Sequence, residues 1–318
     1  KEKEITRLEG LYRKGLENNK AEMIDSRAVL TGPNSVRIQT TGKEVTAERI
    51  MIAVGGRPNA MVDLDGSEHC IVSDDVFDLA ELPKSMVVLG AGYIALEFAC
   101  VFAQLGTKVT VVYRGDEILR GFDGDVRTHL RQEMENKGIA FKFETNIQSV
   151  VEQDGSKQVL LTNGETLVAD QVLLAAGRTP NTTNLGLESV GIEVEWGGKI
   201  VVNEYSQSSV PSIFAVGDVA GPFQFTHTAS HQAWYAAVNS LFGVVKKFKA
   251  DYSVIPWATF SDPEVARVGL NERDAIAKGI DFEVTRYALD DLDRAIADGE
   301  ARGFVKVITQ HLVIKHHF

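Results

Sequence analysis

Cysteine is scarce in this sequence, which contains only Cys70 and Cys100. Two cysteines this far apart can form neither the disulfide framework of a small secreted protein nor a Cys-x-x-Cys metal site. No apolar run reaches the roughly 18 residues that a membrane helix needs, and no charged-then-apolar leader opens the chain. We therefore expect a cytoplasmic protein that does not enter a membrane.

Basic residues are outnumbered: Lys and Arg total 33 against 44 Asp and Glu, a net charge of −11. So acidic a chain is a poor candidate for binding nucleic acid or an anionic membrane surface. Hydrophobic residues make up 44% and charged residues 24% of the 318 positions. This composition is that of a globular protein with a real core, which excludes a disordered chain, and the length predicts two or three domains.

Strands and helices alternate from residue 85 onward, which predicts an open parallel sheet. Before that point, a helical pattern over 1–19 begins without a methionine, and we expect the chain to be part of a longer one. The last residues hold three histidines to which we assign no role: His311, His316 and His317. The predicted strands are 27–30, 35–38, 49–54, 86–89, 108–113, 172–176 and 213–216, and the predicted helices are 1–19, 90–105, 123–137, 227–242 and 272–278.

A glycine-rich turn follows the buried strand 86–89 and opens a helix. It reads Gly90-x-Gly92-x-x-Ala95. Gly90 permits the tight turn, Gly92 lets the backbone approach a pyrophosphate, and Ala95 lets helix and strand pack closely. The helix N-terminus then offers free N–H groups to the anion. The motif in this context predicts a dinucleotide-binding site.

The second strand of this unit ends at Tyr113 and is followed by Arg114 and Arg120. An NAD site expects an acidic residue here, whereas guanidinium groups suit a 2′-phosphate. Asp116 and Glu117 lie nearby, and the alternative is two solvated surface arginines. The placement favours NADPH.

Two further patterns follow strands. The run 52–58 ends in Gly-Gly-Arg-Pro, and a similar ending recurs at Gly177-Arg178. Gly217-Asp218 follows the strand 213–216, where a carboxylate can accept hydrogen bonds from the ribityl chain of a flavin. Alone, a Gly-Asp pair is usually a turn; its weight here comes from its order after the nucleotide motif.

The order of these motifs resembles the flavin-dependent pyridine nucleotide–disulfide oxidoreductases, which include glutathione reductases, dihydrolipoamide dehydrogenases and mercuric reductases. Up to about residue 215 the sequence is most similar to the glutathione reductases. The segments that carry the resemblance are 1–8, 52–58, 90–99, 113–123, 177–181 and 215–219. The segment 260–270 is instead more similar to the mercuric reductases and dihydrolipoamide dehydrogenases.

The resemblance implies FAD and NADPH as cofactors and roles for individual residues. Tyr93 would cover the nicotinamide pocket, Glu97 would face a lysine near the flavin, Arg114 and Arg120 would hold the 2′-phosphate, and Asp218 would bind the ribityl chain. The further cofactor-binding positions are Gly55, Gly90, Gly92, Ala95, Gly177, Arg178, Gly217 and Thr226. We expect no metal centre, because His227 and His231 lie one helical turn apart without a third ligand.

Three departures from the family pattern stand out. The chain has neither the N-terminal flavin-binding Gly-x-Gly-x-x-Gly with its Cys-x-x-x-x-Cys pair nor the C-terminal His-Pro segment. Cys70 and Cys100 lie in other motifs, so we do not expect them to be the redox pair. The run 224–233 also differs from the one expected of glutathione reductases.

The predicted fold is α/β, with a Rossmann-like NAD(P)-binding domain (83–203) inserted in a partial FAD-binding domain (1–82 and 204–250). A partial α+β dimerisation domain (251–318) follows. The predicted function is an NADPH-dependent FAD disulfide reductase acting on glutathione disulfide, a homodimer in its full-length form. The alternatives are a mercuric reductase or dihydrolipoamide dehydrogenase-like enzyme, and a catalytically incomplete NADPH-binding fragment.

Overall fold

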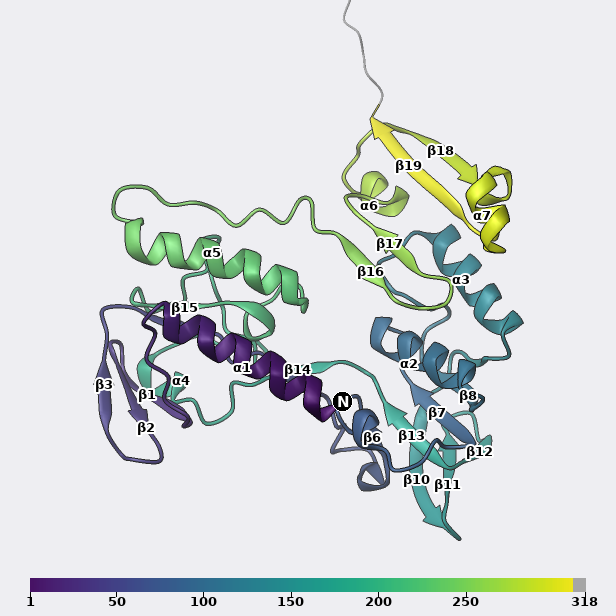
Figure 1. Cartoon of the computed structure of the whole chain (residues 1–318), viewed down its shortest axis with the longest axis horizontal. Helices are drawn as coiled ribbons and strands as arrows, with labels where there is room; N and C mark the ends of the chain where they lie inside the picture. Colours follow the sequence, from purple (N-terminus) through teal and green to yellow (C-terminus); the bar gives the residue numbers. More distant parts are fainter. Residues whose placement is uncertain (311–318) are drawn as a thin grey trace, which may run out of the picture. The chain divides into compact units, whose positions relative to one another are not determined.

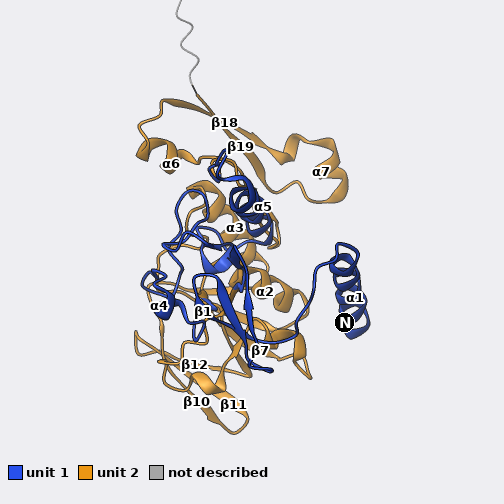
Figure 2. Ribbon diagram, turned by 90° about the vertical axis from the view of Figure 1, so that its left-hand side faces the viewer, with its two compact units in different colours: residues 1–55, 180–250 blue, residues 56–179, 251–318 orange. Residues whose placement is uncertain are grey.

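The computed structural model describes residues 1–310, so the three terminal histidines lie outside the described part. The chain forms two compact units (Figure 2): residues 1–55 with 180–250, and residues 56–179 with the segment from 251 onward. Both units mix helices and strands, which confirms the predicted α/β class. No helix within residues 1–310 is both long and apolar enough to cross a bilayer.

A five-stranded parallel sheet forms the core of the second unit (Figure 1). Its strands, in spatial order, are β6 (Ile71–Val72), β13 (Gln171–Leu174), β7 (Ser85–Leu89), β8 (Lys108–Val112) and β9 (Ala140–Lys142). The helix α2 (Tyr93–Gln104) follows β7, and α3 (Gly124–Asn136) comes between β8 and β9. This is the strand–helix alternation expected from the sequence.

Both faces of this sheet are covered, which is why its strands are almost continuously apolar. Met86 and Val88 of β7 belong to the core cluster shared with α2 and α3. Val87 and Leu89 point the other way, into a cluster shared with an antiparallel three-stranded sheet. That sheet consists of β10 (Ile147–Gln153), β11 (Ser156–Leu161) and β12 (Thr166–Ala169).

The chain passes between the units at 55/56, 179/180 and 250/251, and the predicted domain limits lie at 82/83, 203/204 and 250/251. Residues 56–82 group with the second unit because β6 pairs with β13. Near the passage, two short strands pair with each other, and Arg178 donates to the carbonyl of Gly56 at 2.8 Å. The short elements here are β5 (Gly56–Pro58), β14 (Arg178–Pro180), η1 (Ser67–His69) and η2 (Asp75–Asp78).

The segment from 251 onward adds two antiparallel hairpins and short helices to the second unit. Its elements are β16 (Trp257–Thr259), β17 (Val265–Arg267), α6 (Glu272–Ala277), β18 (Phe282–Ala288), η4 (Leu289–Asp291), α7 (Asp293–Asp298) and β19 (Phe304–Gln310). Lys306 of β19 is 8% exposed in its side chain and forms ion pairs with Asp123, Asp125 and Glu272.

The first unit has a smaller core around Ile52, Ile213 and Ala215. β4 and β15 pair in parallel, and β1, β2 and β3 form an antiparallel sheet. The helix α1 buries none of its residues. The elements of this unit are α1 (Glu2–Asn18), β1 (Ala28–Gly32), β2 (Ser35–Ile38), β3 (Glu44–Thr46), β4 (Ile50–Ile52), α4 (Leu187–Val190), β15 (Ile213–Ala215), η3 (Gly217–Val219) and α5 (Thr226–Phe242).

Candidate dinucleotide-binding site

The turn between β7 and α2 has the geometry that its sequence motif requires. Gly90 has φ +124°, and a Cβ there would lie 2.4 Å from the carbonyl oxygen of Ala175. Gly92 is the N-cap of α2, which no side chain caps, and no described atom lies within 4 Å of where its Cβ would be. Ala95 is fully buried. The uncapped helix end and the open space over Gly92 fit a pyrophosphate.

The loop that connects β8 to α3 lies against this turn. The N–H of Leu119 donates to the carbonyl of Ala91 at 2.9 Å, and Leu119 has a positive φ of +47°. Ile118, Leu119 and Phe122 are each at most 2% exposed. Apolar side chains thus hold the loop in the core while its polar residues stay at the surface.

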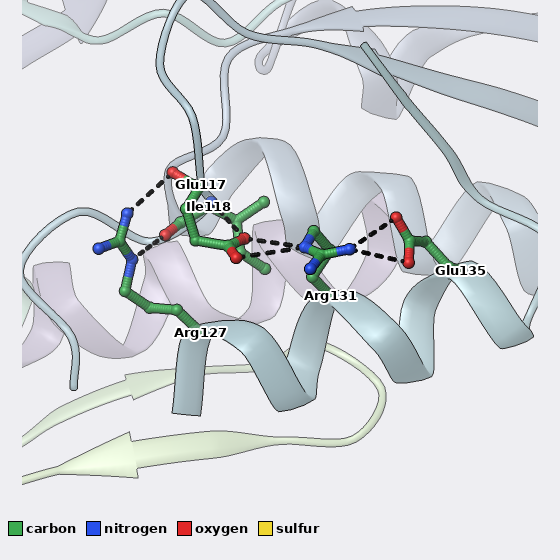
Figure 3. Close-up of polar contacts among 5 residues, drawn as sticks. All are labelled: Glu117, Ile118, Arg127, Arg131 and Glu135. Carbon is green, nitrogen blue, oxygen red and sulfur yellow. Dashed lines mark hydrogen bonds and ion pairs between the residues drawn. The ribbon is translucent and has the colours of Figure 1, made fainter. Parts of the chain in front are cut away.

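Two arginines of α3 stabilise this loop (Figure 3). Arg127 donates to the carbonyls of Ile118 at 2.6 Å and Glu117 at 3.1 Å. Arg131 binds the carboxylate of Glu117 with both oxygens at 3.2 Å from Nε, and also binds Glu135 at 3.0 Å. The negative charge of Glu117 is therefore compensated by Arg131.

The two arginines predicted to select the coenzyme behave differently. Arg114 and Arg120 are exposed, and neither has a polar partner among residues 1–310. Asp116, between them, is exposed as well. The loop thus presents two uncompensated guanidinium groups close to the Gly90–Ala95 turn, while the charge of Glu117 is compensated.

Tyr93 and Glu97 lie one turn apart on α2. Tyr93 is half-buried against the core cluster. An oxygen of Glu97 accepts a hydrogen bond from the backbone N–H of Phe260 at 3.0 Å. Burial raises the pKa of the Glu97 carboxyl, and this hydrogen bond opposes the rise. Among residues 1–310, no lysine contacts Glu97, so its predicted lysine partner is not found there.

The second predicted turn, after β15, belongs to the other unit. Gly217 has φ +77° and donates its N–H to the side chain of Gln232 at 2.6 Å. The side-chain amide of Gln232 in turn donates to the carbonyl of Gly221 at 2.6 Å. Asp218 is half-buried within η3, and Thr226 is the exposed first residue of α5, which has no side-chain cap. The half-buried carboxylate in η3 fits the ribityl chain of a flavin, and the N-terminus of α5, which no side chain caps, fits a phosphate.

The remaining predicted glycines lie in turns at the passages between the units. Gly55 has φ +67°, and its carbonyl accepts from the N–H of Asn181 at 3.0 Å. Gly177 has φ +127°, and its carbonyl accepts from the N–H of Asn59 at 3.0 Å. Together with the contact of Arg178 to Gly56, these bonds give all three residues a local structural role.

Cys100 belongs to the core cluster shared with α2 and α3, and Cys70 packs against the cluster that contains Val87 and Leu89. Burial raises the pKa of Cys70 to about 11, and burial also raises the pKa of Cys100. Asp123, Asp125 and Glu272 form the one acidic cluster of metal-binding geometry within residues 1–310, and the ammonium of Lys306 is bound to all three.

Three polar residues were missed from the sequence. Gln232 is 1% exposed and bridges Gly217 to Gly221, and only its place on a largely apolar helix could have signalled it. Arg267 and Asn271 contact the loop 113–123 through the carbonyl of Gly121. The position of Asn271 before a helix predicts a cap, but no sequence pattern predicts this contact.

The turn, the parallel sheet and the second glycine turn are the features of a two-nucleotide redox protein, and sequence comparison agrees. Residues 2–233 match the family model of the pyridine nucleotide-disulphide oxidoreductases, and residues 255–312 match the dimerisation domain of the same family. The chain belongs to the pyridine nucleotide-disulphide oxidoreductase family, as the resemblance implied. This is a family of enzymes, and its glutathione reductase members use FAD and NADPH, the cofactors predicted from the sequence.

Three relatives show how similar the chain is to individual proteins of this kind. A glutathione reductase from Burkholderia cepacia is 39% identical over 97% of this chain and 68% of its own length. A dihydrolipoyl dehydrogenase from Geobacillus stearothermophilus is 34% identical over 93% of this chain and 63% of its own. The HOCl-induced flavoprotein disulfide reductase RclA of Escherichia coli matches in structure with a TM-score of 0.83 and 28% identity. That match covers 91% of this chain and 66% of RclA. The chain thus spans about two thirds of these relatives.

Proposed function

We propose that the chain belongs to an NADPH-dependent FAD disulfide reductase whose preferred substrate is glutathione disulfide. The observation that carries the coenzyme choice is the loop 113–123. It presents Arg114 and Arg120 without polar partners among the described residues, while Arg131 compensates Glu117. Guanidinium groups bind a 2′-phosphate by charge-assisted hydrogen bonds, whereas a ribose 2′-hydroxyl calls for a free carboxylate.

Each residue then has a task in binding. The first N–H groups of α2 hold the pyrophosphate over Gly92, and Arg114 and Arg120 hold the 2′-phosphate. Tyr93 covers the nicotinamide pocket until the coenzyme displaces it, and Glu97 borders the same pocket. In the other unit, Asp218 accepts hydrogen bonds from the ribityl chain, and Gly55, Gly217 and Thr226 also bind cofactor. Gly177 and Arg178, in the same unit as the Gly90–Ala95 turn, are the remaining cofactor-binding positions. Bound FAD supplies the two-electron relay between a nicotinamide and a disulfide.

The substrate, assembly and location are parts of the same proposal. The glutathione reductase of B. cepacia, at 39% identity, supports glutathione disulfide. The match of residues 255–312 to a dimerisation domain supports a homodimer. A cytoplasmic role in thiol redox homeostasis is consistent with two cysteines that are both free.

The coenzyme test is a comparison of NADPH and NADH affinities, measured by fluorescence titration of the intact protein. A charged hydrogen bond contributes about 1.5–3 kcal/mol, so R114A/R120A should raise the Kd for NADPH by at least about tenfold. The Kd for NADH should stay within about twofold, because NADH lacks the 2′-phosphate. R273A is the matched control, since Arg273 is exposed and has no polar partner among residues 1–310. Equal losses for both coenzymes would contradict the assignment.

A dihydrolipoamide dehydrogenase or mercuric reductase activity is the second candidate, favoured by the 34% identity to the G. stearothermophilus enzyme. Side-by-side assays of the intact protein with glutathione disulfide, lipoamide and mercuric ion separate the candidates. Turnover of lipoamide or mercuric ion, without turnover of glutathione disulfide, would replace the proposed substrate and leave the coenzyme assignment standing.

A further inference from the structure

The loop 113–123 is held from a distant part of the sequence. The carbonyl of Gly121 accepts a hydrogen bond from the side-chain amide of Asn271 at 3.0 Å and another from Arg267. The next residue, Phe122, packs edge-to-face on Trp257 with ring centroids 5.1 Å apart. All three partners belong to the segment that matches the dimerisation domain. This segment therefore fixes the backbone directly after Arg120.

The two donors are themselves fixed by a small closed network. Asn271 is buried, and its side-chain oxygen caps α6 by accepting from the N–H of Asp274 at 2.9 Å. The carboxylate of Asp274 accepts from the N–H of Asn271 at 3.2 Å and from Arg267 at 2.8 Å. A helix cap needs only the acceptor. The donor half of the Asn271 amide is therefore available to Gly121.

Arg120 depends on this arrangement because its own side chain makes no polar contact among residues 1–310. Its position is set by the backbone on either side: the N–H of Leu119 is bound to Ala91, and the carbonyl of Gly121 is bound to Asn271 and Arg267. Gly121 has φ +100°, and in the same peptide the N–H of Phe122 donates to the carbonyl of Leu119 at 3.0 Å. Without its two donors, the carbonyl of Gly121 loses its side-chain partners, and the bond from Phe122 to Leu119 and the packing of Phe122 on Trp257 are left to hold this peptide.

We propose that Asn271, with Arg267, is a positioning residue for Arg120 and so sets the preference for NADPH over NADH. This inference rests on the proposed role of Arg120 at the 2′-phosphate. It assigns coenzyme selection partly to a segment that lies outside the nucleotide-binding sheet.

The test uses N271S, because serine can still cap α6 but is too short to reach the carbonyl of Gly121. Loss of one neutral hydrogen bond, about 0.5–1.5 kcal/mol, predicts that the Kd for NADPH rises about two- to tenfold. The Kd for NADH should not change, because NADH lacks the 2′-phosphate that Arg120 would hold. R302A is the control: Arg302 pairs with Glu133 on α3 at 3.3 Å, away from Gly121. It should leave the NADPH to NADH affinity ratio unchanged.

A double-variant cycle separates positioning from general destabilisation. If Asn271 acts through Arg120, N271S lowers the affinity ratio in the wild type but not in R120A. Equal weakening of both coenzymes by N271S, or the same loss in both backgrounds, would overturn the inference. If the single variant R120A has the same NADPH to NADH affinity ratio as the wild type, Arg120 does not bind the 2′-phosphate. The inference about Asn271 then fails together with that assignment. If N271S folds poorly, R267K is the second variant. Lysine lacks the forked guanidinium that lets Arg267 bond Gly121 and Asp274 together, so R267K should lower the NADPH to NADH affinity ratio in the same way. An unchanged ratio overturns the inference.

Discussion

The two glycine turns of the molecule, one after β7 and one after β15, both place a glycine at positive φ but are held by different contacts. β7 is a central strand of five, and its last four residues are at most 3% exposed. β15 pairs with β4 alone within the described sheets, and Met51 of β4 is 39% exposed. The first turn is fixed by backbone packing at Gly90, the second by the side-chain clasp of Gln232. The nucleotide turn is thus built into its sheet, whereas the flavin-type turn depends on one buried amide.

The largest effect should come from breaking the first turn. G90A places a methyl group 2.4 Å from the carbonyl of Ala175 and forces alanine to φ +124°. Strain and overpacking together should lower the free energy of unfolding by roughly 4 kcal/mol. Chemical denaturation measures it.

G92A is the matched control for that change. Its Cβ would meet no described atom, and its φ of −82° suits alanine. Stability should therefore hold, while NADPH affinity falls because the methyl group occupies the space over the helix N-terminus. Similar stabilities for G90A and the wild type would refute the packing argument.

Removing the ammonium of Lys306, which pairs with Asp123 at the end of the loop 113–123, should have the next largest effect. K306M leaves Asp123, Asp125 and Glu272 facing one another, and a broken buried ion pair costs about 3 kcal/mol. Burial opposes the charge of Lys306, but hydrogen bonds to Asp125, Glu272 and Asp123 outweigh it and raise its pKa. Urea denaturation at neutral pH gives the comparison with wild type.

The pH dependence of stability supplies a second readout for this variant. The hydrogen bond from Lys306 holds the pKa of Asp125 below its ordinary value, so this contribution is present above that ordinary value and is lost on acidification through the lowered one. K306M removes this contribution, so the loss of stability relative to wild type should be largest above the ordinary pKa of Asp125 and should shrink on acidification through the lowered one. A difference from wild type that stays constant on acidification would argue against the contribution of the Lys306–Asp125 pair.

Breaking the clasp of the second turn should cost less. Q232L removes two hydrogen bonds of 2.6 Å and leaves the N–H of Gly217 and the carbonyl of Gly221 buried without that partner. A loss of about 2 kcal/mol is expected. Because the clasp lies in the first unit, NADPH affinity should be unaffected. S230A, an exposed change on the same helix, is the control; a variant as stable as S230A would show that the clasp is dispensable.

The smallest effect is expected from the cysteines. With its pKa raised to about 11, Cys70 carries little thiolate near neutral pH, so alkylation by maleimide should be slow and should speed up as the pH approaches that value. C70S should leave coenzyme binding and activity unchanged. Loss of disulfide reduction in C70S would identify Cys70 as part of the redox machinery.

The extent to which the sequence predicts this structure differs between the turns. The β7 turn follows from local rules: a buried strand, two glycines and a small residue at fixed spacing. The helix was predicted from residue 90 but begins at Tyr93, because residues 90–92 form the turn itself. The strand β6 was not predicted, because its two residues are too short to show a periodicity.

Contacts between residues far apart in the chain could not be predicted from the sequence. The sequence does not distinguish the four arginines of this region. Arg127 and Arg131 bind the loop and α3, whereas Arg114 and Arg120 are exposed. Only the folded arrangement of α3 shows that Glu117 is compensated. Likewise, the partner of Glu97 is a backbone N–H from residue 260, which no spacing rule predicts.

The most direct test of the central claim is a crystal structure of the intact protein with NADPH bound. The account predicts the pyrophosphate over Gly92 at the N-terminus of α2, and the 2′-phosphate between Arg114 and Arg120, with Glu117 still bound to Arg131. A 2′-phosphate directed to solvent, or a carboxylate of Asp116 or Glu117 on the ribose, would contradict it.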